Sequence, residues 1–151
     1  MDIVASLYER NFQASVIEEI ADDIFIPITV GGGIRTVDDA RNLLRVGADK
    51  LAVNTAAVRN PDLLSSLVDH FGSQCIVASI EAKKISHKSY EIFTESGRER
   101  TGISVEEWLD TVQLRGVGEI LITSIDREGT RQGFDLELID LVSSKCDKSL
   151  V

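Results

Sequence analysis

The chain is poor in cysteine, proline, histidine and aromatic residues. It has two cysteines, two prolines and two histidines, and aromatic side chains make up 5% of its 151 residues. Cys75 lies in an apolar run and Cys146 near the C-terminal end, so we expect free thiols rather than a disulfide or a metal site. Neither His70 nor His87 has partners at metal-ligand spacing. No metal and no cofactor are therefore predicted.

The chain also lacks an excess of basic residues and any long apolar run. Its formal net charge of −9 argues against a nucleic-acid surface, which needs clustered Lys and Arg. No apolar stretch approaches the ~20 residues that cross a bilayer, and Met1–Ser6 does not have the pattern of a signal peptide. With 43% apolar residues, the composition predicts one globular, cytoplasmic domain over residues 1–151 that binds neither nucleic acid nor membrane.

Four short apolar runs alternate with helical patterns and predict strands. The runs are Ile26–Val30, Lys50–Val53, Ile76–Ile80 and Glu119–Ile125. Because they are apolar at nearly every position, we expect both faces of the sheet to be covered, which is typical of a parallel α/β sheet.

Helical patterns predict helices at residues 12–22, 36–46, 60–71, 104–115 and 136–142. Thr36 with Asp39 and Ser104 with Glu107 are capping boxes, and Asn60-Pro61 predicts an N-cap followed by a proline at the first helical position.

The segment between the third and fourth predicted strands is longer than the segments between the others, and it contains the extra residues Lys83–Thr101. Within it Tyr90–Thr94 alternates like an exposed strand, which predicts a hairpin insertion over residues 83–101 on the carboxyl side of the sheet. In a barrel of this class, ligand-gating loops occupy that side. A solvated hairpin without a function is the alternative.

Two polar groups follow successive strands. Gly31-Gly32-Gly33 comes after the first predicted strand and Asn54-Thr55 after the second, each just before a helical pattern. Backbone amides beside a helix start favour an anion, and glycine permits its close approach. This pattern indicates a phosphate-binding site, although turns also use glycine freely.

The chain starts and stops inside this repeating pattern. Residues 2–6 look like the end of a strand, and Leu150-Val151 stands where another strand should begin. Because a parallel sheet that stops there would leave unpaired edges, the sequence is interpreted as the middle of a larger (βα) protein.

Five segments resemble the cyclase subunit of imidazole glycerol phosphate synthase. They are DIVAS (2–6), PITVGGGIRT (27–36), GADKLAVNTAAV (47–58), FGSQCIVASIEAKK (71–84) and GVGEILITSIDREGT (116–130). The resemblance covers essentially the whole chain and implies a partial TIM (βα)8 barrel, from the tip of the second barrel strand through the sixth helix. The family is a lyase of histidine biosynthesis that closes an imidazole ring from ammonia and a phosphoribulosyl-formimino-AICAR phosphate substrate.

The resemblance also implies the site residues. Glu81 stands where the family has a catalytic Asp at the end of the fifth strand, and the Glu side chain is one methylene longer than that Asp. The catalytic Asp of the first strand has no counterpart here. An exposed glutamate at a strand end is the alternative for Glu81. The residues that match substrate- or phosphate-binding positions are Gly33, Asn54 and Thr55 for one phosphate, Glu128 and Gly129 for the second, and Asp2 and Asp126 at two strand tips. Asp126 fits a turn-capping role equally well.

At the opposite end of the barrel, the family admits ammonia from a glutaminase subunit through a ring of charges. Lys50 and Glu119 match two gate positions and Asp49 an interface position, although a structural salt bridge explains the first two equally well. Passage of ammonia needs small side chains, and Ala52, Ala78 and Thr123 are the candidates. The implied partners are thus a glutaminase subunit, ammonia and a bisphosphorylated small molecule.

Three functions remain open at this stage. The chain is an enzyme component, an inactive fragment that binds a phosphate or a partner, or a paralogue in surface-sugar biosynthesis that Glu81 would mark. Whether it is an enzyme by itself is left undecided, because the first-strand Asp has no counterpart. Uncovered apolar strand edges predict self-association, since each exposed large side chain forfeits about 1.5–3 kcal/mol of burial.

Overall fold

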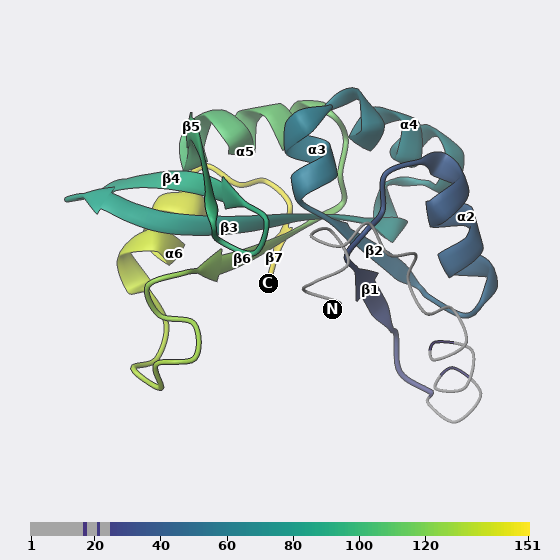
Figure 1. Ribbon diagram of the computed structural model, residues 1–151, viewed down its shortest axis with the longest axis horizontal. Helices are drawn as coiled ribbons and strands as arrows, with labels where there is room; N and C mark the ends of the chain where they lie inside the picture. The colour runs from purple at the N-terminus through teal and green to yellow at the C-terminus, as the bar shows by residue number, and fades with distance from the viewer. Residues whose placement is uncertain (1–16, 18–20, 22–24) are drawn as a thin grey trace.

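The computed structural model describes Ile17, Ala21 and residues 25–151 (Figure 1). Most of the helix predicted at residues 12–22, and Asp2, lie outside the described residues. The described helices are α2 (Val37–Arg45), α3 (Thr55–Arg59), α4 (Asp62–Phe71), α5 (Val105–Leu114) and α6 (Leu136–Ser143), with a 3₁₀ turn at Ser73–Cys75. The strands are β1 (Thr29–Gly31), β2 (Lys50–Val53), β3 (Ile76–Ser86), β4 (Ser89–Thr94), β5 (Glu99–Ser104), β6 (Glu119–Ser124) and β7 (Ser149–Leu150).

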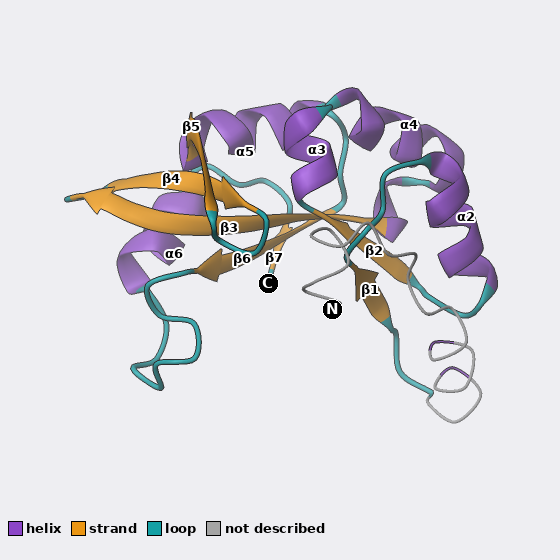
Figure 2. Cartoon of the chain, viewed as in Figure 1, coloured by secondary structure: helices purple, strands orange, loops and turns teal. Residues whose placement is uncertain are grey.

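Five strands form the parallel part of the sheet in the order β1-β2-β3-β6-β7 (Figure 2). The intervening helices give the predicted βα alternation, and α2, α3, α4 and α5 lie along one side of the sheet in Figure 1. The sheet is not closed, because β1 pairs only with β2 and β7 only with β6 in the described part of the chain. This architecture confirms the predicted partial (βα)8 barrel.

The pairing of β7 moves one predicted boundary. The sequence placed the last complete element at the sixth helix and expected a strand to begin at Leu150. In the structure Ser149 and Leu150 already pair with Glu119 and Ile120 of β6, and the Val151 amide donates to the Ile120 carbonyl (2.9 Å). The described barrel therefore extends into the first residues of the strand after α6.

Two helices begin as their sequences predict. Thr36 accepts a hydrogen bond from the Asp39 amide (3.1 Å), and Asp39 accepts one from the Thr36 amide (2.9 Å). Ser104 and Glu107 make the same reciprocal pair at the start of α5. Because each cap satisfies amides that have no partner within the helix, it stabilises the helix by about 1 kcal/mol.

The helix predicted to begin at Pro61, with Asn60 as its N-cap, begins one residue later, because an additional short helix precedes it. Asn60 ends α3, and its amide donates to the Ala56 carbonyl (2.9 Å). The chain then turns at Pro61, and α4 begins at Asp62. Short helices such as α3 are difficult to predict, because five residues carry too little periodicity.

The parallel strands alternate between the two faces of the sheet. On β3, Ile76, Ala78 and Ile80 belong to the hydrophobic core shared with the helices, whereas Ser79 and Glu81 line a cavity. This is the period of two expected for a strand. Trp108 of α5 is 3% exposed and packs in the core, as predicted. The prediction that Ala78 lies along an ammonia passage is not supported, since Ala78 packs on the helix side.

The segment 83–101 forms the predicted hairpin, but its middle strand is not exposed. β3 runs on beyond the parallel sheet and pairs antiparallel with β4, and β4 pairs antiparallel with β5. Residues Tyr90–Glu95 are all buried, because Tyr90 and Ile92 join the core and α5 packs against the hairpin. Tyr90 also donates its hydroxyl hydrogen to Asp135 at the start of α6 (3.0 Å).

Among the described residues, no helix is both long and apolar enough to cross a membrane.

Candidate functional site

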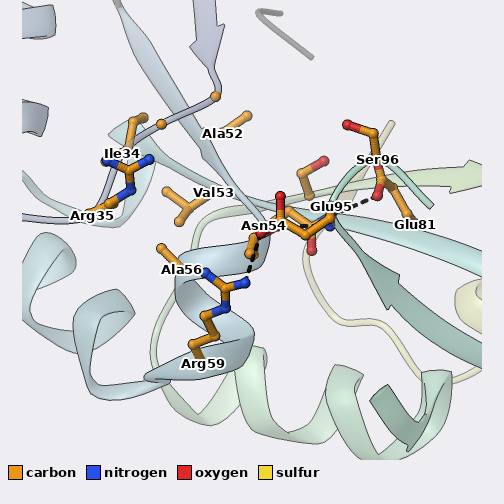
Figure 3. A pocket seen from close by; sticks show the side chains of 14 residues that line it. Ile34, Arg35, Ala52, Val53, Asn54, Ala56, Arg59, Glu81, Glu95 and Ser96 are labelled. Carbon is orange, nitrogen blue, oxygen red and sulfur yellow. Dashed lines mark hydrogen bonds and ion pairs between the residues drawn. The ribbon is translucent and has the colours of Figure 1, made fainter. Parts of the chain in front are cut away.

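A cavity of about 270 Å³ lies at the carboxyl ends of β1 and β2 and beside the middle of β3 (Figure 3). The loop after β1, the start of α3, the middle of β3 and the turn between β4 and β5 all contribute to its wall. The lining residues are Gly32, Gly33, Ile34, Arg35, Ala52, Val53, Asn54, Thr55, Ala56, Arg59, Ser79, Glu81, Glu95 and Ser96. The cavity thus brings together four of the predicted catalytic and phosphate-binding residues (Gly33, Asn54, Thr55 and Glu81) from three separate strands.

The glycine loop shapes one wall of the cavity. Gly32 has a φ of 110° and Gly33 a φ of 69°, a left-handed backbone that glycine adopts without strain. The start of the following helix is already neutralised, since Asp39 accepts the amides of Arg35 and Thr36 (3.0 and 2.9 Å). The loop itself, rather than the dipole of α2, is therefore the feature that suits an anion here.

Asn54 and Thr55 form the adjoining wall at the end of β2. The Asn54 Nδ2 donates to Glu81 Oε2 (3.1 Å), with a long contact to the Phe93 carbonyl (3.5 Å). The Thr55 Oγ1 accepts a hydrogen bond from the Glu95 amide (3.1 Å). Because this bond occupies the oxygen as an acceptor, the hydroxyl hydrogen of Thr55 is left to donate to a ligand.

Glu81 is half-buried on the cavity wall, so the alternative of an exposed glutamate does not hold. Its Oε2 accepts bonds from Asn54 Nδ2 and from the Gly97 amide (2.9 Å). Burial raises the pKa of Glu81 above its ordinary value, and the nearby charge of Glu95 adds to the rise, while the bonds from Gly97 and Asn54 oppose it. A carboxyl whose pKa is raised suits a proton-transfer role.

Three charged residues of the cavity were missed by the sequence analysis: Arg35, Arg59 and Glu95. The Arg59 Nη2 pairs with Glu95 Oε1 (2.9 Å) and lies 3.8 Å from Glu99 Oε2; Figure 3 shows Arg59 reaching from α3 toward Glu95. The Glu95 side chain is 6% exposed. A signal existed for Glu95, since the hairpin was predicted to return to the carboxyl side and its turn must then meet the strand ends.

The residues predicted for the second phosphate do not line this cavity. Glu128 and Gly129 lie in the exposed loop between β6 and α6. The Asp126 Oδ2 accepts the Lys84 amide (2.8 Å), so Asp126 joins that loop to β3, in keeping with its predicted structural alternative. The second phosphate position stays a prediction.

The predicted gate residues occupy the opposite ends of the strands. Lys50 at the start of β2 and Glu119 at the start of β6 form a half-buried ion pair, and Asp49 accepts the Ile28 amide (2.8 Å). Thr123 stands beside Glu81 in the sheet register, toward the carboxyl end and thus apart from these charges. The geometry accordingly contains the predicted structural salt bridge, and the gate role stays a prediction.

The described residues contain no group of three or more His, Cys, Asp or Glu side chains that could hold a metal ion. Cys75 and Cys146 are both free thiols. Cys75 ends the 3₁₀ turn just before β3.

Parallel βα units with a polar cavity at the carboxyl ends of the strands define a barrel-type α/β protein, a class in which ligands bind at that end of the strands. Comparison with known families gives a match over residues 1–151 to the family described as "Histidine biosynthesis protein". The chain belongs to this family, which confirms the resemblance found in the sequence.

Three curated relatives are each called imidazole glycerol phosphate synthase subunit HisF. The protein from Legionella pneumophila is 58% identical over 95% of this chain and 68% of its own length. Those from Natranaerobius thermophilus and Dictyoglomus thermophilum are 49% and 46% identical, over 95% and 93% of this chain. This chain spans 57% and 56% of their lengths, a little over half.

Proposed function

We propose that this chain carries the central strands of an imidazole glycerol phosphate synthase cyclase subunit. The reaction is closure of the imidazole ring from ammonia and a phosphoribulosyl-formimino-AICAR phosphate substrate in histidine biosynthesis. The observation that carries the proposal is the convergence of Gly33, Asn54, Thr55 and Glu81 on one cavity, in a chain whose relatives bear that name.

In this proposal one phosphate of the substrate lies against the Gly33 loop and the Thr55 hydroxyl. Thr55 donates a hydrogen bond to a phosphate oxygen, and the bare backbone at Gly33 permits close approach. The Arg59 guanidinium, on the same wall, offsets part of the phosphate charge. Glu128 and Gly129 are proposed to contribute to a second phosphate position beyond β6, outside this cavity.

Glu81 is the proposed acid–base group. Its Oε2 is held by Asn54 and the Gly97 amide, so Oε1 is the oxygen left to exchange a proton with the substrate. Since burial raises the pKa of Glu81, the carboxyl holds its proton to a higher pH than a solvated glutamate and can donate it during ring closure. No cofactor is needed for this role.

The proposed partners follow from the opposite end of the strands. A glutaminase subunit is proposed to dock near Asp49, and ammonia to enter past the Lys50–Glu119 pair. The half-buried position of this pair and the small side chain of Ala52 in the cavity wall support such a route. Among the described strands β1 pairs only with β2 and β7 only with β6, which supports self-association of the chain or pairing with further strands.

A phosphate-binding chain without turnover is the second candidate. It is favoured by the cavity wall at Gly33 and Thr55, which suits an anion whether or not a reaction follows.

Ammonium-dependent ring closure on the isolated chain, with Glu81→Gln as the inactive control, separates the two candidates. Turnover that Glu81→Gln abolishes supports the cyclase. Inorganic phosphate binding that Thr55→Val weakens, without turnover, supports the second candidate. Absence of both activities refutes the phosphate site itself.

A further inference from the structure

The turn between β4 and β5 has an unusual backbone for its sequence. Glu95, Ser96 and Gly97 have successive φ values of 50°, 60° and 75°. Glycine adopts this left-handed conformation freely, whereas Glu and Ser carry a Cβ that makes it unfavourable. Such a conformation persists only where the surroundings hold it in place. The contacts of the turn therefore identify the residues that stabilise this conformation.

Those contacts are made almost entirely with the candidate site. The Glu95 amide donates to Thr55 Oγ1 (3.1 Å), and the Gly97 amide donates to Glu81 Oε2 (2.9 Å). The Glu95 carboxylate pairs with Arg59 (2.9 Å). Within the turn, the Arg98 amide donates to the Thr94 carbonyl (3.0 Å). Three contacts thus fasten the turn to three residues of the cavity wall.

Each of these contacts orients a group that the proposed function uses. With its oxygen occupied by the Glu95 amide, Thr55 presents its hydroxyl hydrogen as a donor. With Oε2 occupied by the Gly97 amide, Glu81 keeps Oε1 toward the substrate. The ion pair holds Arg59 beside Thr55, on a long side chain that would otherwise be mobile in solvent.

The position of the Glu95 side chain is energetically unfavourable for its carboxylate. Its side chain is 6% exposed, and its Oε2 is buried without a hydrogen-bond partner in the described part of the chain. A buried carboxylate oxygen that lacks a partner is unfavourable. Its negative charge also faces the place where a phosphate would bind. A carboxylate in this position would weaken phosphate binding if it acted through its charge alone.

We propose that Glu95 is a positioning residue of the phosphate site: through its amide and its ion pair with Arg59, it holds the β4–β5 turn against Thr55 and Glu81 and so assembles the cavity wall. The inference rests on the proposed phosphate site and adds to it a residue on the hairpin insertion. The hairpin is then part of the site, rather than a solvated hairpin without a function.

The direction in which phosphate affinity changes distinguishes a positioning role of Glu95 from an effect of its charge alone. Glu95→Gln removes a negative charge beside the site, which by electrostatics alone tightens phosphate binding. If Glu95 positions the wall, the same substitution weakens the binding of inorganic phosphate, by about tenfold, because a charge-assisted bond that holds the site is lost. Glu99→Gln is the matched control: Glu99 also lies near Arg59 (3.8 Å) but is 60% exposed, so its removal should change the affinity by less than about twofold.

A second measurement tests the positioning without a ligand. Amide hydrogen exchange reports whether the Gly97 amide is still bonded to Glu81. We expect faster exchange at Gly97 in Glu95→Gln and wild-type exchange in Glu99→Gln, with far-UV circular dichroism unchanged in both variants.

Weaker phosphate binding together with faster Gly97 exchange supports the inference. Equal or tighter binding in Glu95→Gln overturns it and leaves the phosphate site standing. If wild-type chain does not bind inorganic phosphate, the proposed site fails, and unchanged Gly97 exchange in Glu95→Gln then overturns the positioning role independently.

Discussion

Thr55→Val replaces the hydroxyl of Thr55 by a methyl group of nearly the same shape. The Glu95 amide then loses the acceptor to which it donates at 3.1 Å. A buried amide without a partner costs about 1–3 kcal/mol, a substantial share of a typical total stability of about 5–15 kcal/mol. The free energy of unfolding should fall by that amount, with an unchanged dependence on urea concentration.

The same substitution should weaken the binding of inorganic phosphate by about 10- to 100-fold, since a hydrogen bond to a charged group contributes about 1.5–3 kcal/mol. Urea unfolding and isothermal titration calorimetry measure the two effects. Thr111→Val is the matched control: its hydroxyl donates to the Glu107 carbonyl on the exposed face of α5 (2.9 Å), so stability should change by less than about 0.5 kcal/mol. Equal effects at the two threonines would refute the reasoning.

Three further predictions concern charge and backbone. Because the pKa of Glu81 is raised above 4.5 in the folded protein, the folded state binds more protons than the unfolded state, and the free energy of unfolding falls as pH rises from about 4.5 through the folded pKa. Glu81→Gln should remove this fall in urea titrations across pH 4–8. A parallel decline in the variant would contradict the assignment. Lys88 has a φ of 54° in the β3–β4 turn, so Lys88→Gly should raise the melting midpoint by relieving about 1 kcal/mol of strain, whereas a lower midpoint would count against it. Lys50→Met should destabilise the chain more than the double variant Lys50→Met/Glu119→Leu, since the single change leaves a half-buried carboxylate without its partner; the reverse order in chemical denaturation would show that the pair is not coupled.

The elements that the sequence predicted well are those specified by neighbouring residues. The capping boxes at Thr36 and Ser104 and the apolar runs of β2 and β3 need no information from distant parts of the chain. The meeting of Asn54, Thr55 and Glu81 was also predictable, because the carboxyl ends of adjacent parallel strands share one edge of the sheet.

The elements that it predicted poorly depend on distant partners. Glu91 in the middle of β4 makes that strand look solvent-exposed, yet Glu91 is 7% exposed. The Arg100 side chain pairs with it (2.6 Å) and the Gly102 amide donates to it (2.9 Å), and these bonds lower the pKa of Glu91. The pairing depends on the register of β4 against β5, which alternation in β4 alone does not reveal. Arg59 and Glu95 were missed for the same reason.

The hairpin has two ends with different tolerance to changes in length. At the β3–β4 tip, residues 83–89 are exposed, so two extra residues in each arm would carry the tip about 7 Å farther into solvent and leave the Glu81–Phe93 pairing intact. The β4–β5 turn does not tolerate such a change, since the amides of Glu95 and Gly97 bond to Thr55 and Glu81 in the cavity wall. At the tip the Lys88 amide donates to Glu137 of α6 (2.5 Å), so an affinity tag or reporter peptide inserted between His87 and Lys88 would give up this exposed contact and leave the cavity wall intact.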